Sequence, residues 1–144
     1  MKKSPWKLDP LFTPRSIAVI GASPNGGAGS IVLRNMQRLG YTGTVYPINP
    51  KYKEIFGYPC YASLRDPPPR AAGPAVLRGS RSLLPVLGGA HAAGVKGVWG
   101  FASGFAETGG EGRAMQRRIH DFCHESGLLF CGPNCVGYAN ITDK

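Results

Sequence analysis

The chain has 144 residues, of which 42% are hydrophobic, and it carries 17 basic against 8 acidic side chains, a net charge of +9. This length fits one domain with its own core, no apolar run approaches the ~20 residues of a membrane span, and the basic amino terminus lacks the apolar segment of a signal peptide. The basic residues are scattered without stacking aromatics between them, so we expect a cytoplasmic globular protein with no nucleic acid or membrane partner, whose charge suits a small anionic ligand.

The first motif follows a basic, proline-containing lead-in over residues 1–14, and we expect a single domain over residues 15–144. Residues 15–20 are almost all apolar, which is typical of a central strand in a parallel sheet. A glycine-rich loop comes next, and a helix is predicted over residues 26–39, with Gly40 ending it. In such a loop, backbone N–H groups and the positive end of the helix dipole face a bound anion. The order predicts a phosphate-binding loop, with an ordinary tight turn as the alternative.

Two common phosphate-binding motifs do not fit this loop. Gly21 and Gly26 have the spacing of a P-loop, but Gly27 and Ala28 stand where a lysine and a serine or threonine are needed. A dinucleotide fingerprint could begin at Gly27, but Val32 takes the place of its third glycine. The loop by itself therefore does not identify the nucleotide.

The second predicted strand, Thr44–Ile48, leads into Asn49, Pro50 and Lys51. NAD-binding domains place an acidic residue near this point, where it accepts hydrogen bonds from the ribose hydroxyls. A lysine instead favours a nucleotide with an additional phosphate, and coenzyme A, with its 3′-phosphate, fits that description. An NAD-binding regulatory domain is correspondingly disfavoured.

The middle of the chain has weaker patterns. Residues 53–64 indicate a loop with a short turn. Prolines and a glycine within residues 66–81 oppose a long strand and leave Ala75, Val76 and Leu77 as the third strand. This segment is either a shortened strand or a local reading-frame error. A helix is predicted over residues 82–93, and the Gly88-Gly89 pair weakens it by about 1 kcal/mol per glycine relative to alanine.

In the last third of the chain, predicted strands and helices alternate regularly again. A strand is predicted over residues 95–101, and Thr108 and Glu111 have the spacing of a capping box that would start the next helix. Gly127 should end that helix, and residues 128–131 form the last predicted strand. Strands and helices that alternate in this way predict an α/β fold with a Rossmann-like, doubly wound parallel sheet in a single domain.

Taken together, four segments carry a family resemblance. They are residues 11–23 (LFTPRSIAVIGAS), 46–51 (YPINPK), 101–107 (FASGFAE) and 132–137 (GPNCVG). In this order and spacing the chain resembles the coenzyme A-binding domain of ADP-forming (NDP-forming) acyl-CoA synthetases and the related succinyl-CoA ligase alpha subunit. The resemblance implies coenzyme A as the cofactor and coenzyme A or acyl-CoA as the ligand.

The resemblance also implies a set of cofactor-binding positions. They are Gly21, Ala22, Ser23, Pro24, Lys51, Phe101, Ala102, Ser103, Asn134 and Cys135. The first four match the first coenzyme-binding loop, and Lys51 matches a lysine that meets the nucleotide phosphates. The positions from Phe101 to Ser103 match a stretch beside the pantetheine arm, although the related ligase subunit has a carboxylate in place of the serine. The last two would lie near the thiol of the cofactor.

No catalytic or metal-binding residue is expected in this chain. The full enzymes of the resembled family use a phosphorylated histidine on a later domain and a separate ATP-grasp module, and His91, His120 and His124 match no such motif. Cys135 reads as a small structural residue more readily than as a nucleophile, since no base lies near it in sequence. The resemblance implies the coenzyme A-binding fragment or subunit of an ADP-forming acyl-CoA synthetase, not catalytic alone, with the missing domains as partners. The alternative is a stand-alone coenzyme A- or nucleotide-binding regulatory module.

Overall fold

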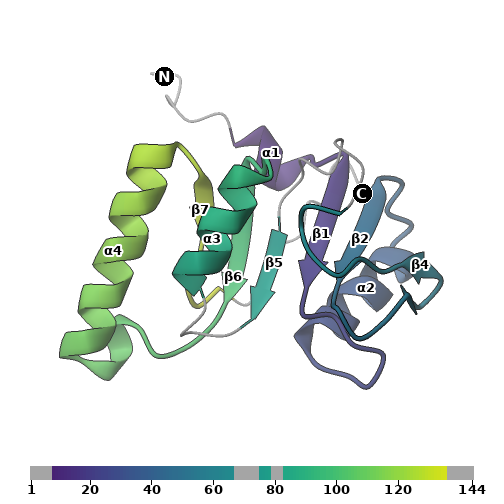
Figure 1. Cartoon of the computed structure of the whole chain (residues 1–144), viewed down its shortest axis with the longest axis horizontal. Helices are drawn as coiled ribbons and strands as arrows, with labels where there is room; N and C mark the ends of the chain where they lie inside the picture. Colours follow the sequence, from purple (N-terminus) through teal and green to yellow (C-terminus); the bar gives the residue numbers. More distant parts are fainter. Residues whose placement is uncertain (1–7, 67–74, 79–82, 136–144) are drawn as a thin grey trace.

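The computed structural model describes residues 8–66, 75–78 and 83–135, which form an α/β domain (Figure 1). The main sheet has five strands in the order β2-β1-β5-β6-β7, and each neighbouring pair is parallel. The strands are β1 (Ser16–Ile20), β2 (Thr44–Ile48), β5 (Ala75–Arg78), β6 (Gly97–Phe101) and β7 (Leu129–Cys131). This is one of the two common doubly wound strand orders, so the predicted fold class is confirmed. The third strand exists, and it is short.

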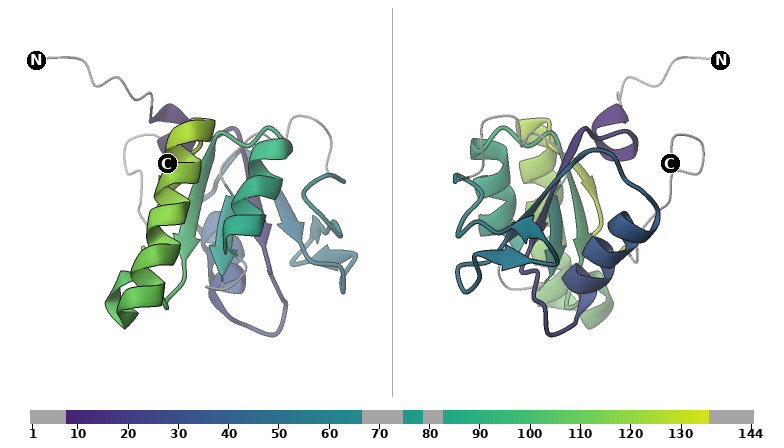
Figure 2. Two further views of the ribbon diagram at one scale, coloured as in Figure 1. Left: turned by 60° about the vertical axis from the view of Figure 1, so that its left-hand side comes forward. Right: turned by 90° about the vertical axis from the view of Figure 1, so that its right-hand side faces the viewer.

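Helices cover both faces of the sheet (Figure 2). α2 (Ala28–Arg38) lies on one face, and α3 (Leu83–Ala92) and α4 (Gly110–Ser126) lie on the other. The alternation of side chains along β1 divides the core accordingly. Val19 packs into a buried cluster with α2, whereas Ala18 packs into the cluster that contains the buried residues of α3 and α4. A short helix, α1 (Asp9–Phe12), packs against β6.

The loop expected over residues 53–64 instead contains a small β-hairpin. β3 (Glu54–Ile55) pairs antiparallel with β4 (Tyr58–Pro59). Phe56 and Gly57 form the turn, with φ values of 53° and 82°. Positive φ at both central residues is what a two-residue hairpin turn requires, because its twist then matches that of the strands. A loop with a short turn was expected here, and the turn is present, but the two short strands were not predicted because phenylalanine rarely occupies such a turn position.

The predicted capping box at the start of α4 was also wrong. Thr108 ends a short 3₁₀ helix (Ala106–Thr108), and its hydroxyl donates a hydrogen bond of 2.9 Å to the carbonyl oxygen of Phe105. Gly109 is the N-cap, and no side chain caps the helix there. The spacing of Thr108 and Glu111 suggested a capping box, but the hydroxyl of Thr108 is already hydrogen-bonded to Phe105 in the turn before α4.

The amino-terminal and carboxyl-terminal boundaries of the helices follow their glycines. Gly26 and Gly27 have φ values of 105° and 97°, so they belong to the loop, and α2 starts at residue 28 instead of the expected 26. Gly127 ends α4 in the left-handed conformation, as predicted. None of the helices within the described ranges is long and apolar enough to cross a membrane.

Candidate functional site

The site expected from the sequence lies at the carboxyl edge of the parallel sheet. The chain leaves β1 toward α2 on one face and leaves β5 toward α3 on the other, and β1 and β5 are neighbours. Loops that diverge in this way open a crevice at the edge of the sheet, and open α/β sheets bind ligands there. All of the predicted cofactor-binding residues follow, or end, a strand at this edge. The structure therefore brings them to the same edge from four different loops.

The first loop is packed tightly onto the start of α2. Ala22 is fully buried, and a Cβ atom added to Gly29 would lie 2.9 Å from the Cα of Ala22. Gly29 therefore allows the first turn of the helix to contact the loop backbone directly. This is the role that the third glycine has in a dinucleotide fingerprint, where it permits close packing of helix and strand. Sequence matching placed Val32 at that position, so this part of the interpretation was wrong in register.

The polar groups of the first loop hold its shape. The amide of Asn25 donates to Oγ of Ser23 at 3.1 Å, and the hydroxyl of Ser30 donates to the carbonyl oxygen of Ser23. The amide of Gly21 donates to the carbonyl oxygen of Ile48 at 2.9 Å. Gly21 and Pro24 are exposed at the mouth of the loop. Ser23 thus shapes the turn as an acceptor, and its hydroxyl can still donate to an anion alongside the backbone amides of the loop.

The electrostatics of this loop favour an anion. The N-cap of α2 is Gly27, so no side chain caps this end of the helix, and its first turn contains no acidic residue. Its N–H groups carry the positive end of the helix dipole. Lys51 is exposed in the adjacent loop, and no ion pair involving it is found among the described residues. A phosphate group could therefore meet both the helix terminus and a cation.

Asn49 connects these two loops, and sequence reasoning did not single it out. Its Nδ2 donates to the carbonyl oxygen of Ala22 at 2.7 Å, and its Oδ1 accepts from the amide of Lys51 at 3.0 Å. The backbone amide of Asn49 donates to the carbonyl oxygen of Tyr61 at 2.8 Å. The only sequence signal was asparagine before proline at the end of a strand, a common turn-forming pair. The side chain fixes the position of the lysine relative to the first loop.

The remaining predicted residues form a second pair of joined loops, after β6 and β7. The amide of Ala102 donates to the carbonyl oxygen of Pro133 at 2.9 Å, and the amide of Cys135 donates to that of Gly100 at 3.1 Å. These bonds frame an antiparallel bridge between Phe101 and Asn134. The side chains of Asn134 and Phe101 are exposed, the latter at 36%, and Ser103 is exposed beside them.

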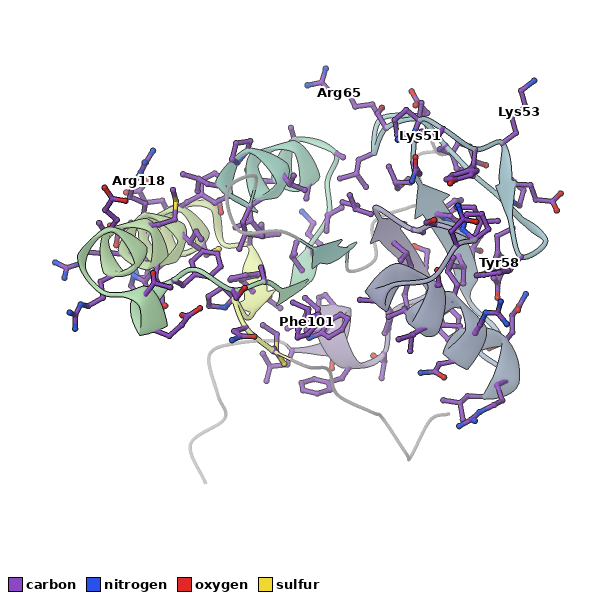
Figure 3. All side chains as sticks on the ribbon, turned by 90° about the horizontal axis from the view of Figure 1, so that it is seen from below. Lys51, Lys53, Tyr58, Arg65, Phe101 and Arg118 are labelled. Carbon is purple, nitrogen blue, oxygen red and sulfur yellow. The ribbon has the colours of Figure 1, made fainter. Side chains whose placement is uncertain are left out.

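The two halves of the site are separate. Figure 3 looks onto this edge, and Lys51 and Phe101 lie well apart in it. The hydrogen bonds described above join the loops after β1 and β2 to each other, and the loops after β6 and β7 to each other. Such an arrangement suits an extended ligand that contacts each half with a different chemical group, and not a compact one.

Other candidate features lie elsewhere. A cavity of about 660 Å³ lies between α3 and α4, lined by Met115, Arg118 and Phe122 among others, away from the strand edge. His120 contacts Asp121 and stacks on His124, both on the outer surface of α4. No group of three or more histidine, cysteine or acidic side chains that could hold a metal ion occurs in the described part of the chain.

Several proteins similar to this chain are ADP-forming acetate–CoA ligases. The chain is 34% identical over 134 residues to the ADP-forming acetate–CoA ligase I of Archaeoglobus fulgidus, and 35% identical over 134 residues to the alpha subunit of the ADP-forming acetate–CoA ligase II of Pyrococcus furiosus. Each match covers 92% of this chain but only 19% and 29% of the relative, respectively. The chain thus spans less than a third of these curated relatives.

The fold of the chain is also similar to that of a solved acetyl-coenzyme A synthetase. The dinucleotide forming acetyl-coenzyme A synthetase 1 of Ca. Korarchaeum cryptofilum, in complex with phosphate and ADP, superposes with a TM-score of 0.84 at 37% identity, over 92% of this chain and 28% of that one. Residues 15–140 match the family described as CoA binding domain, which is most of the chain. The chain therefore belongs to the CoA binding domain family, and coenzyme A is its cofactor.

Proposed function

We propose that coenzyme A lies extended along the carboxyl edge of the sheet. Its phosphorylated adenosine end contacts the loop of Gly21, Ala22, Ser23 and Pro24 and the ammonium group of Lys51. Its pantetheine arm then runs past the loops after β6 and β7. The thiol at the end of this arm lies near Asn134 and Cys135. The observation that carries this proposal is the arrangement of two separate loop pairs at one edge, each held together by its own hydrogen bonds.

The chemistry of the two halves supports this orientation. The first half offers backbone amides, a helix amino terminus and a lysine, and these groups bind phosphate. The second half offers the exposed face of Phe101, the hydroxyl of Ser103 and the amide of Asn134. Those groups suit an arm with amides and methylenes better than a highly charged one. Reversing the cofactor would move its phosphates away from Lys51 and from the amino terminus of α2.

The relatives support a proposal for the wider role. We propose that the chain supplies the coenzyme A-binding part of an ADP-forming acyl-CoA synthetase and is not catalytic alone. Further domains or subunits would phosphorylate a histidine and bind the nucleotide, so that together they perform acyl-CoA + ADP + phosphate ⇌ acid + CoA + ATP. We propose that this activity is cytoplasmic. We also propose that residues 15–144 form the binding domain and that residues 1–14 are a lead-in to it.

Calorimetric titration with coenzyme A, dephospho-coenzyme A and NAD tests the site. We expect coenzyme A to bind most tightly, since only it carries the 3′-phosphate. Lys51→Gln should weaken coenzyme A binding by about 3- to 10-fold, because one exposed charged contact contributes on the order of 1 kcal/mol. The same change should leave dephospho-coenzyme A binding within about twofold, if Lys51 meets that phosphate.

Lys53→Gln is the matched control. Lys53 is exposed, carries the same charge and lies two residues further along the same segment (Figure 3). Its loss should change the affinity by less than about twofold, since it lies outside the site and long-range effects are screened by salt. If both variants lost the same affinity for coenzyme A, the loss would be due to net charge alone. That result would contradict the role assigned to Lys51.

The wider role has its own test. The Archaeoglobus fulgidus ligase, shortened by the segment that this chain matches, is mixed with the chain, acetate, coenzyme A and ATP. Acetyl-CoA formed only in the mixture supports the synthetase role. Binding of coenzyme A without any activity in the mixture would instead favour a stand-alone regulatory module.

A further inference from the structure

Two thiols lie side by side at the second half of the site. Cys131 ends β7 and Cys135 follows Asn134, and their Sγ atoms are 3.5 Å apart. Both side chains are half-buried and pack with the cluster around Trp99 on the α2 face of the sheet. Cys123 belongs to the cluster on the opposite face, among the residues of α3 and α4. The pair is therefore separated by the sheet from that third thiol.

The backbone fixes the proximity of the pair. Cys131 is in register with Trp99 on β6, and the amide of Cys135 donates to the carbonyl oxygen of the next residue, Gly100, at 3.1 Å. Both cysteines are thus anchored to adjacent residues of one strand. A disulfide bond is about 2.05 Å long, so the sulfurs must approach each other by roughly 1.5 Å. Side-chain rotation and a small shift of the exposed loop between them provide a movement of that size.

The hydrogen bond between the thiols assigns them different roles. The thiol of Cys131 donates to the sulfur of Cys135. Burial raises the pKa of Cys131, and the neighbouring thiol of Cys135 raises it further. Cys131 therefore gives up its proton less readily than an ordinary thiol does, and a thiolate forming at Cys135 would accept a hydrogen bond from it. Since the thiolate is the nucleophile in thiol–disulfide exchange, Cys135 is the attacking sulfur and Cys131 resolves the intermediate.

We propose that Cys131 and Cys135 form an oxidation site at which a low-molecular-weight disulfide closes an intrachain disulfide bond. The thiolate of Cys135 attacks one sulfur of the disulfide RSSR, which breaks the S–S bond, forms a Cys135–SR mixed disulfide and releases RS⁻. Cys131 then loses its proton and attacks the sulfur of Cys135, and the second RS⁻ leaves. In sum, two cysteine thiols are oxidised and RSSR is reduced to two RSH, with two protons and two electrons passing to the reagent.

The bond would constrain the loop that contains Asn134. Gly132, Pro133 and Asn134 lie between the two cysteines, and the oxidation draws Cys135 toward β7. This movement alters the contacts of Asn134 and Cys135 with coenzyme A, an inference that rests on the proposed position of the cofactor thiol. We therefore expect the oxidised chain to bind coenzyme A at least threefold more weakly than the reduced chain.

Mass spectrometry tests the disulfide directly. The reduced chain is incubated with glutathione disulfide, alkylated with iodoacetamide and cleaved after Glu125, which separates Cys123 from the peptide with the pair. We expect that peptide to lose two hydrogen atoms and to resist alkylation until it is reduced. A peptide that remains fully alkylated, or a persistent glutathione adduct on the wild-type chain, would overturn the proposal.

Single variants test the order of attack. Cys131→Ser should accumulate a glutathione adduct on Cys135, because the resolving thiol is missing. Cys135→Ser should react much more slowly, because the attacking thiol is missing. Cys123→Ser is the control and should form the intrachain disulfide as the wild type does. A stable adduct in the Cys135→Ser variant and none in Cys131→Ser would contradict the assigned roles.

Titration of both redox forms with coenzyme A tests the consequence. Equal affinities would refute the link between oxidation and the site, whatever the mass of the peptide. Failure of the reduced chain to bind coenzyme A at all would refute the proposed function instead, and the mass measurement still tests the thiol pair independently.

Discussion

The contact between α2 and the first loop predicts that two glycine-to-alanine changes have opposite effects. Gly29→Ala places a Cβ atom 2.9 Å from the Cα of Ala22, and real Cβ atoms essentially never come within 3.0 Å of a heavy atom outside their own residue and its chain neighbours. The new Cβ is bonded directly to the helix backbone and the Cα of Ala22 is part of the loop backbone. Neither atom can rotate away, so the helix or the loop must shift. Overpacking of this kind costs about 1–3 kcal/mol, whereas alanine gains at most about 1 kcal/mol in helix propensity. We expect a net loss of about 1–2 kcal/mol.

Gly88→Ala in α3 is the matched control. A Cβ atom there meets nothing within 4 Å, so only the propensity gain of about 0.5–1 kcal/mol remains. Urea unfolding gives both free energies, and for a domain of this size 1 kcal/mol shifts Tm by about 4 °C. The loop should also bind coenzyme A more weakly in Gly29→Ala, because its amides move. A Gly29→Ala variant as stable as the wild type would refute the close packing inferred for this site.

Three further outcomes follow from single contacts. Asn49→Ala removes two hydrogen bonds and leaves the carbonyl oxygen of Ala22 unpaired, so the free energy of unfolding should fall by about 1–3 kcal/mol, whereas Asn35→Ala on the exposed face of α2 should not lower it. Leu87→Ala empties a fully buried position between α3 and the sheet and should cost about 2–5 kcal/mol by the same measurement; a loss below about 1 kcal/mol would contradict that packing. Burial raises the pKa of Cys123 from 9.0 to about 11, so its contribution to stability is present below about pH 9 and is lost as the pH rises toward 11, a loss that should be absent from the unfolding curves of Cys123→Ala.

The local patterns of the chain predicted most of the regular structure. The apolar run of β1, the strand Thr44–Ile48 and the glycine that ends α4 all appear as expected, because each depends on neighbours in the sequence. The hairpin of β3 and β4 was missed because its strands are only two residues long and its turn uses Phe56. Periodicity needs a longer window than such a hairpin offers.

The site shows the same division. Its loops could be placed after strands from the order of elements, and Lys51 and Asn134 came from matched segments. Asn49 could not be found in this way, because its bond to Ala22 joins residues that are 27 positions apart. The role of Gly29 was likewise invisible, since the restriction comes from a backbone that returns to it in space.

By itself, the sequence determined that strands and helices alternate, that a glycine-rich turn precedes the first long helix, and that a lysine replaces the acid of NAD-binding domains. Those features are local, because hydrophobic period, turn chemistry and charge act over a few residues. Only the tertiary structure decided that the loops form two pairs at one edge, that Asn49 joins the first pair, and that Cys131 meets Cys135. The strand order brings these groups together, and strand order depends on the packing of both faces of the sheet, which no short stretch of sequence specifies.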